Sequence, residues 1–120
     1  MAVGFWNPEK EDLLRIRKEF EVDDSEIRDI INDNTLQSIW GDLVGEELKT
    51  APKGFDKAHS AIDLIRRKQF IFVKKLSNKD VIAPGFAETV SNNFKTIRPF
   101  FNYMSAVLTT DLNGVSTIKD

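Results

Sequence analysis

Residues 70–76 read Phe-Ile-Phe-Val-Lys-Lys-Leu, the most strand-like stretch of the chain, because aromatic and β-branched side chains favour extended backbone. A lone strand cannot satisfy its own backbone hydrogen-bonding groups, so it needs a partner. Two weaker extended segments, Val3–Trp6 and Glu46–Thr50, are the candidates. The stretch therefore predicts a small antiparallel sheet.

Helical patterns account for most of the remaining sequence. Apolar side chains recur every three or four residues behind start signals at Asn7-Pro8, Asp23, Asn34 and Ser60, and Ser77 with Asp80 reads as a further capping pair. We therefore expect an α+β fold, mostly helical, with a small antiparallel sheet.

The longest helical pattern begins at Phe86, and Pro99 within it is predicted to kink or divide the helix. Trp40, on an earlier stripe, and Phe94, on this one, are expected in the core, where replacement by alanine costs roughly 3–5 kcal/mol. The stripe of the long helix comprises Val90, Phe94, Ile97, Phe101, Met104 and Leu108.

The bulk properties are those of one folded domain. The chain has 120 residues, of which 41% are hydrophobic and 30% charged. We expect one domain over residues 1–111, and a flexible tail over 112–120, where periodicity is lost. Cysteine is absent, which excludes disulfides and thiolate metal sites and agrees with a cytoplasmic location. The sequence shows no signal peptide and no apolar run near the ~20 residues that cross a bilayer, so no membrane association is expected.

Charge is divided unevenly along the chain. Residues 1–50 carry 6 basic and 13 acidic side chains, whereas residues 51–120 carry 11 basic and 6 acidic ones. The basic cluster Arg66-Arg67-Lys68 and Lys74-Lys75 flanks the predicted strand and could contact phosphates. Charged residues at strand ends more often solvate the strand and discourage edge pairing, so we do not expect nucleic acid as a partner.

His59 is the only histidine. Asp63 lies four residues after it and Asp56 three before, and either carboxylate could orient the imidazole for proton transfer. No serine or cysteine nucleophile has a recognisable context, and one histidine with carboxylates is a thin ligand set. We therefore predict no catalytic triad, no metal site and no cofactor. The alternative is a histidine that makes a local structural hydrogen bond.

The loop at Pro52–Lys57 places Gly54 between two lysines just before a helical pattern. Backbone N–H groups at such a position can hold an anion, although the spacing of a nucleotide-binding loop is absent. The alternative is an ordinary turn that needs glycine. If the loop is a site, the candidate ligand is a small, phosphate-type anion. The candidate residues are Lys53, Gly54, Asp56, His59 and Arg66.

Several motifs together resemble a known family. They are GFWNPEKEDLLRIR, W-G-x-L-x-G-E-x-L-K-x-x-P-K-G-F-D-K-x-H, the FIFVKKLS strand, and a Phe-rich helix with R-P-F-F. From about Val3 to Leu112 they resemble the second half of a bacterial family classed as domain of unknown function (DUF) 2461, most specifically at Pro52–His59.

The resemblance implies no activity, because the family has none established. Two departures matter: Ser60 stands where proline is frequent, and nothing matches the basic R-D-x-R-F-S-x-D-K-x-P-Y-K segment of the family's N-terminal half. The resemblance thus implies a C-terminal fragment or a shortened relative, in which Lys53, Asp56 and His59 supply only part of any site.

Two classes of function stay open. The first is a non-enzymatic binding or interaction domain, which associates with itself as a homodimer or with an N-terminal half-domain. Its surfaces would be the strand edge at Val3–Trp6 and the seam of the long helix. The second is an enzyme or small-anion binding protein that uses the Pro52–His59 loop.

Overall fold

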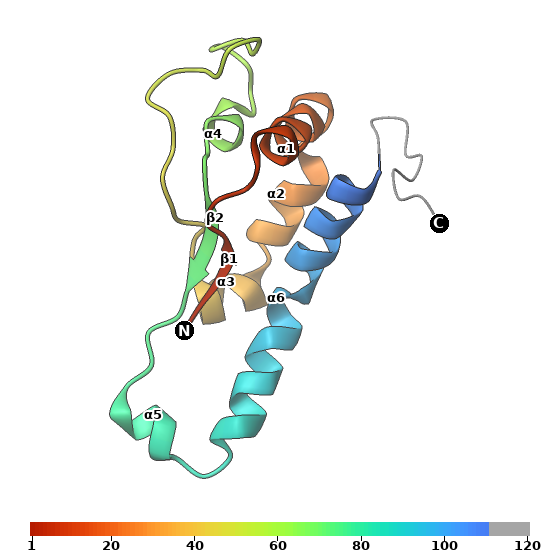
Figure 1. The fold of residues 1–120 in the computed structure, drawn as a ribbon. Helices are drawn as coiled ribbons and strands as arrows, with labels where there is room; N and C mark the ends of the chain where they lie inside the picture. The colour runs from red at the N-terminus through yellow and green to blue at the C-terminus, as the bar shows by residue number, and fades with distance from the viewer. Residues whose placement is uncertain (111–120) are drawn as a thin grey trace.

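A computed structural model describes residues 1–110 (Figure 1). These residues form, in chain order, β1 (Ala2–Phe5), α1 (Lys10–Val22), α2 (Ser25–Ile31), α3 (Asn34–Trp40), α4 (Ile62–Ile65), β2 (Phe70–Val73), α5 (Asn78–Ile82) and α6 (Phe86–Thr109). The fold is α+β and mostly helical with a small antiparallel sheet, as the sequence predicts. The predicted tail at 112–120 lies outside the described residues.

The strand predicted from Phe70 onward, β2, pairs with the N-terminal strand β1. β1 and β2 are antiparallel, with Val3 opposite Phe72 and Phe5 opposite Phe70. β2 ends at Val73, three residues earlier than predicted. The pairing nevertheless continues one step further, since the Lys74 N–H donates to the Met1 carbonyl at 2.7 Å.

The other edge of β2 is covered by an irregular segment that follows α3. Val44 and Ile71 exchange both backbone hydrogen bonds, at 2.7 and 3.1 Å, and the Leu48 N–H donates to the Arg66 carbonyl at 2.8 Å. The predicted edge segment thus exists but begins at Val44. It forms isolated bridges rather than a strand. Gly45, with φ +125°, interrupts the extended backbone between them.

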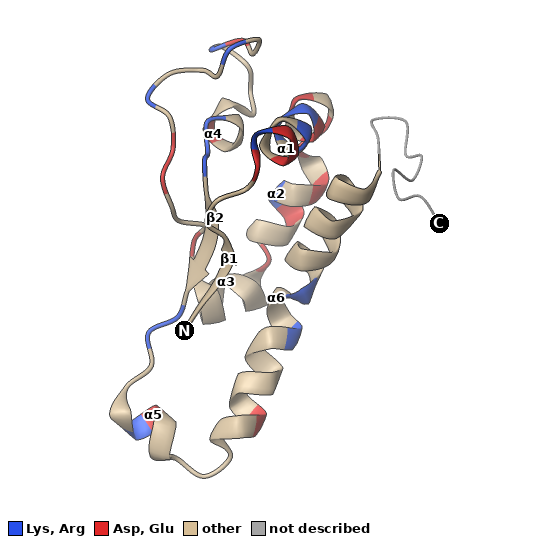
Figure 2. Ribbon diagram, viewed as in Figure 1, with Lys and Arg blue, Asp and Glu red and all other residues tan. Residues whose placement is uncertain are grey.

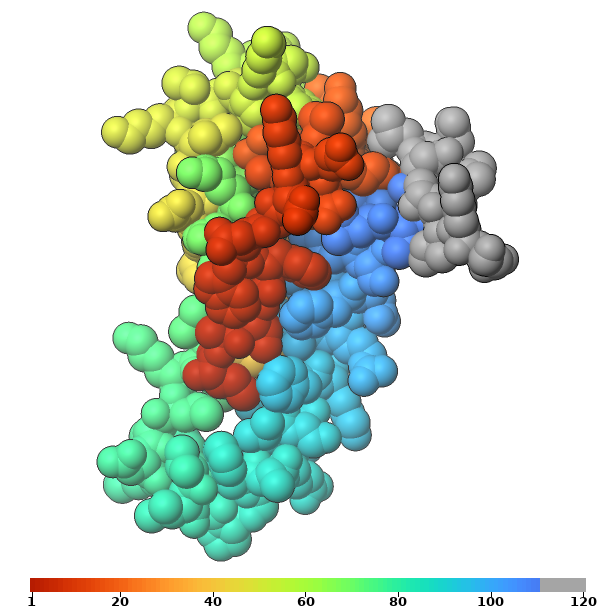
Figure 3. Space-filling model, in the orientation of Figure 1, coloured from red at the N-terminus to blue at the C-terminus, as the bar shows by residue number. Residues whose placement is uncertain are grey.

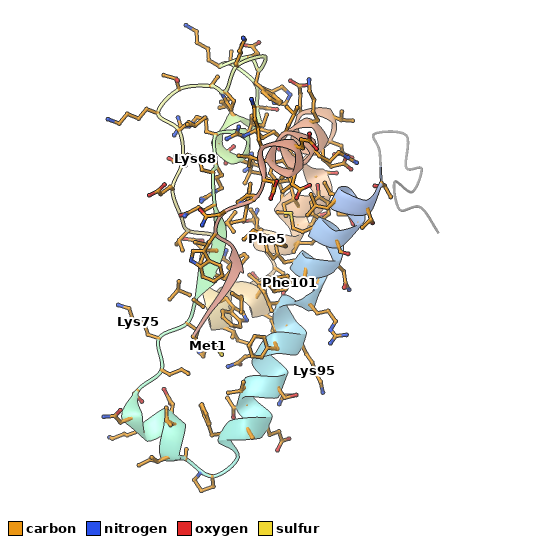
Figure 4. The ribbon with its side chains drawn as sticks, viewed as in Figure 1. Met1, Phe5, Lys68, Lys75, Lys95 and Phe101 are labelled. Carbon is orange, nitrogen blue, oxygen red and sulfur yellow. The ribbon has the colours of Figure 1, made fainter. Side chains whose placement is uncertain are left out.

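The core lies between this sheet and the helices. α6 packs against α1, α2 and α3, and together they cover one face of the sheet (Figure 1). Phe100 is fully buried and contacts the rings of Phe5, Phe72 and Phe101 at centroid distances of 6.2, 5.0 and 5.6 Å. Figure 4 shows Phe5 of β1 and Phe101 of α6 lying next to each other. This aromatic cluster fixes α6 on the sheet.

Pro99 was predicted to kink or divide the long helix, and of these two the division does not occur, since α6 runs unbroken through Pro99. Proline removes one helical hydrogen bond, and the packing of α6 against three helices offsets that loss.

The buried stripe of α6 is also rotated from the predicted one. Phe100 is fully buried where Phe101 was expected, and Phe94 is 42% exposed, so its predicted core position is wrong. The apolar face is wider than one stripe, and contact with the sheet selects its Phe100 side. The prediction for Trp40 is confirmed at 2% exposure. The buried residues of α6 are Asn93, Ile97, Phe100, Tyr103, Met104 and Val107.

Helix boundaries follow the start signals less closely. α1 begins at Lys10 rather than at Asn7-Pro8. Asp23 accepts hydrogen bonds from Ser25 instead of forming a capping box. Asp33, one residue before the predicted start, caps α3 by accepting from the Leu36 N–H at 3.0 Å.

Later helices also differ in length. The helix predicted from the start signal at Ser60 is only the single turn of α4. The capping box of Ser77 with Asp80 at α5 is confirmed. α5 and the first turns of α6 project from the rest of the molecule (Figure 3). The molecule as a whole measures 50 × 39 × 24 Å.

Candidate functional site

The loop from Pro52 forms the predicted turn. The Phe55 N–H donates to the Pro52 carbonyl at 3.1 Å, and Gly54 has a φ of +89° that favours glycine. The Lys53 and Asp56 side chains are exposed. Asp56 Oδ1 accepts a hydrogen bond from the Ala58 N–H at 2.9 Å, which tightens the loop.

His59 holds this loop against α1. Its Nδ1 accepts a hydrogen bond from the Ala61 N–H at 3.0 Å, so the ring proton lies on Nε2, 3.1 Å from the Glu21 carbonyl oxygen. Asp63 instead forms two hydrogen bonds with Arg28, at 2.6 and 2.8 Å. Both ring nitrogens thus contact backbone atoms. His59 therefore has a structural role, which the sequence analysis gave as the alternative to proton transfer.

A cavity of about 530 Å³ lies beside the loop, and it contains only part of the predicted set. Asp56 and Arg66 line it, whereas Lys53, Gly54 and His59 do not. Lys49 and Lys57, which sequence reasoning did not select, line it as well. Arg66 is paired with Glu47 at 2.9 Å, so two lysines supply most of the positive charge.

A larger cleft of about 650 Å³ lies between α1, α2, the start of α3 and the second half of α6. Its lining combines carboxylates with an apolar floor and small polar side chains. The lining residues are Glu19, Glu26, Asp29, Ile30, Asp33, Leu36, Thr96, Pro99, Asn102, Tyr103, Ala106, Val107 and Thr110. We call this the helical cleft.

The charge of the helical cleft is one-sided. Four carboxylates line it and no lysine, arginine or histidine does. Glu19 is paired with Arg15 at 2.8 Å. Glu26 and Asp29 form no ion pair within residues 1–110. The opposite wall, α6 beyond Arg98, bears no charged side chain (Figure 2). The negative charge that is not paired with a cation therefore comes from α2 and the start of α3, and it faces a neutral wall.

Tyr103 contributes a buried hydroxyl to the cleft. The residue is 7% exposed and its ring stacks on Phe20 at 6.5 Å. Among the described residues its Oη has no hydrogen-bond partner. Burial, and then the negative charges of Glu19 and Glu26, raise the pKa of the Tyr103 hydroxyl well above its ordinary value. The group stays neutral and is free to accept or donate a hydrogen bond.

Sequence reasoning missed the helical cleft because it treated the carboxylates of residues 9–33 as surface charges and caps. The three-residue spacing of Glu26 and Asp29 does place these two on one helix side, and this signal was present. Asp33 lies beyond the end of α2, where it caps α3. Only the packing of α2 on α6 brings Tyr103 next to that side, and the sequence pattern does not specify that packing.

Replacement of Tyr103 by phenylalanine is expected to raise the free energy of unfolding by up to about 1 kcal/mol at neutral pH, because it removes a buried hydroxyl without a partner. In the wild type, stability falls as the pH rises above about 10, where the unfolded hydroxyl ionises and the folded one does not. Tyr103→Phe has no such hydroxyl, so its stability should not fall for this reason above about pH 10. Urea unfolding at pH 7 and above pH 10 measures both effects.

Tyr103 is the chain's only tyrosine, so the ultraviolet absorbance change on ionisation reports its pKa alone. A variant that is destabilised by more than about 1 kcal/mol at pH 7 would show that the hydroxyl has a partner. An ordinary pKa in the folded wild type would show that the hydroxyl is solvated.

Comparison with protein families gives one match. The model of the family described as conserved hypothetical protein (DUF2461) matches residues 1–103. The chain therefore belongs to this family, which confirms the resemblance noted above at the level of the family. The match covers the N-terminal part of this chain, so it does not show the narrower expectation of a C-terminal half-domain.

Neither the curated proteins nor the solved structures contain a match to the chain. Within residues 1–110, no helix combines the length and the apolar character needed to cross a membrane.

Proposed function

We propose that this domain is a non-enzymatic binding domain whose ligand carries a cationic organic group, and that the ligand binds in the helical cleft. The observation that carries the proposal is the Tyr103 hydroxyl, which is buried without a partner in a cleft lined by four carboxylates and no cation. A buried polar group without a hydrogen bond is costly, and a bound ammonium group would supply a donor to it.

The chemistry of the lining favours an organic cation. Ammonium and guanidinium groups offer only donors, and carboxylates offer only acceptors. The carboxylates are spread over α1, α2 and the N-terminus of α3 rather than converging on one point, as the ligands of a metal ion must. Ile30, Leu36 and Val107 provide apolar surface for the carbon part of the ligand.

Binding in place of catalysis is supported by the groups that sequence reasoning considered for proton transfer. Both nitrogens of His59 contact backbone. Because the pKa of the Tyr103 hydroxyl is raised, the hydroxyl stays protonated at neutral pH and cannot act there as a base.

The proposal is tested by titration with butylamine at neutral pH and low salt, followed by NMR of the backbone amides. We expect cleft amides to shift with saturation, and the double variant Glu26→Gln/Asp29→Asn to weaken binding about tenfold, because it removes two charge-assisted contacts. Asp42→Asn/Glu88→Gln changes the net charge equally outside the cleft and should leave binding unchanged. Equal losses in the two double variants would contradict the proposal.

A second candidate function is supported by the loop cavity, where Lys49, Lys57 and Arg66 lie together. These cations favour a phosphate-type anion, as proposed from the sequence with Lys53, Gly54, Asp56 and His59. The same titration with inorganic phosphate tests it: amides at 49–57 should shift at millimolar phosphate. Silence there would exclude the loop as an anion site.

Self-association also stays a proposal, as does correspondence to the family's C-terminal half. Within residues 1–110, β1 pairs with a strand on only one side, and Trp6 and Phe94 are 44% and 42% exposed. A second copy or another half-domain could cover these surfaces. Sedimentation over a tenfold concentration range tests the homodimer, which a constant monomer mass would exclude.

We also propose a cytoplasmic location, which is supported by the absence of cysteine.

A further inference from the structure

The carboxylates of the helical cleft form a row rather than a cluster. Glu26 and Asp29 lie on one side of α2, about 5 Å apart along the helix axis at ~1.5 Å per residue, and Asp33 follows just beyond the end of α2 as the N-cap of α3. All three side chains are exposed at the rim of the cleft. Like charges in such a row repel one another, so a ligand that neutralises several of them gains more than one that neutralises a single charge.

The wall that faces the row is suited to an alkyl chain. Pro99, Asn102 and Ala106 of α6 are exposed on this wall and carry no charge. Ile30 and Val107 lie in the floor between the two walls. Methylene groups can therefore pack along the cleft while charged groups reach the carboxylates.

Tyr103 marks one end of the arrangement. The residue is 7% exposed, and its hydroxyl is buried with no partner within the described residues. The charges of Glu19 and Glu26, and the opposite charge of Arg15, act on it. An ammonium group placed there would donate to the Tyr103 oxygen and interact with those two carboxylates. The rest of the row then stays open for further charges.

We propose that the ligand of the helical cleft is a linear aliphatic polyamine, whose ammonium groups interact with successive carboxylates of the row and whose methylene groups pack against α6. The inference rests on the proposed function and adds the class of ligand. A single ammonium group would leave most of the row without a partner. A basic peptide shares the charge but needs space for its backbone, and it is an outcome of the test below.

The test compares butylamine, putrescine and spermidine by calorimetry at neutral pH and low salt. Butylamine and putrescine share a four-carbon chain and differ by one ammonium group. Each added ammonium group is expected to raise the affinity about fivefold or more. In Glu26→Gln/Asp29→Asn the gain from butylamine to putrescine should fall below twofold. Asp42→Asn/Glu88→Gln should keep the full gain.

Tyr103→Phe gives an independent readout, since it leaves every charge in place. Its affinity for spermidine should fall at least threefold, although the variant is not expected to lose stability. Circular dichroism of each variant confirms that it is folded.

The outcomes separate the two proposals. If butylamine and putrescine bind the cleft equally well, the polyamine inference is wrong and the proposed function stands. If none of the three amines binds, both are wrong. If the gain per ammonium group is the same in both double variants, the attraction is general to an acidic surface and the inference is overturned. An arginine-rich peptide that binds more than tenfold tighter than spermidine would replace the polyamine by a peptide ligand.

Discussion

Replacing Trp40 by alanine is expected to lower the free energy of unfolding by about 3–5 kcal/mol. Trp40 is 2% exposed, and its Nε1 donates a hydrogen bond to the Asn93 carbonyl at 3.0 Å. The substitution therefore leaves both a cavity and a buried carbonyl that has lost a donor. Urea unfolding followed by circular dichroism measures the loss.

Phe94→Ala is the matched comparison. Phe94 lies against Trp40, with ring centroids 6.1 Å apart, but it is 42% exposed. Its removal should cost about 1 kcal/mol, since much of the ring is already solvated. Equal losses for the two variants would show that Phe94 is covered in solution, for example by a second copy of the chain.

Replacing Gly4 by alanine is expected to lower the free energy of unfolding by about 2–4 kcal/mol. Gly4 has a φ of +146°, and a Cβ atom there would contact the Phe70 carbonyl and lie 2.7 Å from Ile71 Cα. Both are backbone atoms of the paired strand. The methyl group therefore fits only if β1 moves away from β2.

Gly54→Ala separates the two causes of this loss. Gly54 has a φ of +89°, but a Cβ atom there would meet nothing within 4 Å. Only backbone strain remains, at about 1 kcal/mol. A Gly4→Ala variant as stable as Gly54→Ala would show that β1 does not approach β2 as closely as described.

The sequence was a good guide to the sheet and to the existence of the helices. Phe70, Ile71 and Phe72 have strong strand propensity, and the chain holds two weaker extended segments that could pair with them, so a small sheet was predictable. Which side of α6 is buried did not follow from the sequence, because apolar residues recur with the same helical period on both sides of its apolar face. The position of Phe100 opposite Phe5 and Phe72 decides the rotation, and this is a tertiary contact.

The candidate sites divide in the same way. Gly54 and its turn were predictable from the loop sequence. The bond between His59 and Ala61 is of the local structural kind named as the alternative for this histidine. The bond to Glu21 was not predictable, since α1 supplies it from far along the chain. The helical cleft could not be predicted either, because its carboxylates come from α1, α2 and the start of α3 and its hydroxyl comes from α6. Periodicity identifies the faces of each helix but not the pair of faces that meet.

The most direct test of the central claim, that the helical cleft binds an organic cation, is an intermolecular nuclear Overhauser measurement with putrescine. Tyr103 is the only tyrosine, so its ring signals are unambiguous. The account predicts cross-peaks from the putrescine methylene groups to the Tyr103 ring and to the methyl groups of Ile30 and Ala106, all of which line the cleft. Cross-peaks to residues of the Lys49–Lys57 loop instead, or none to Tyr103 at saturating putrescine, would contradict it.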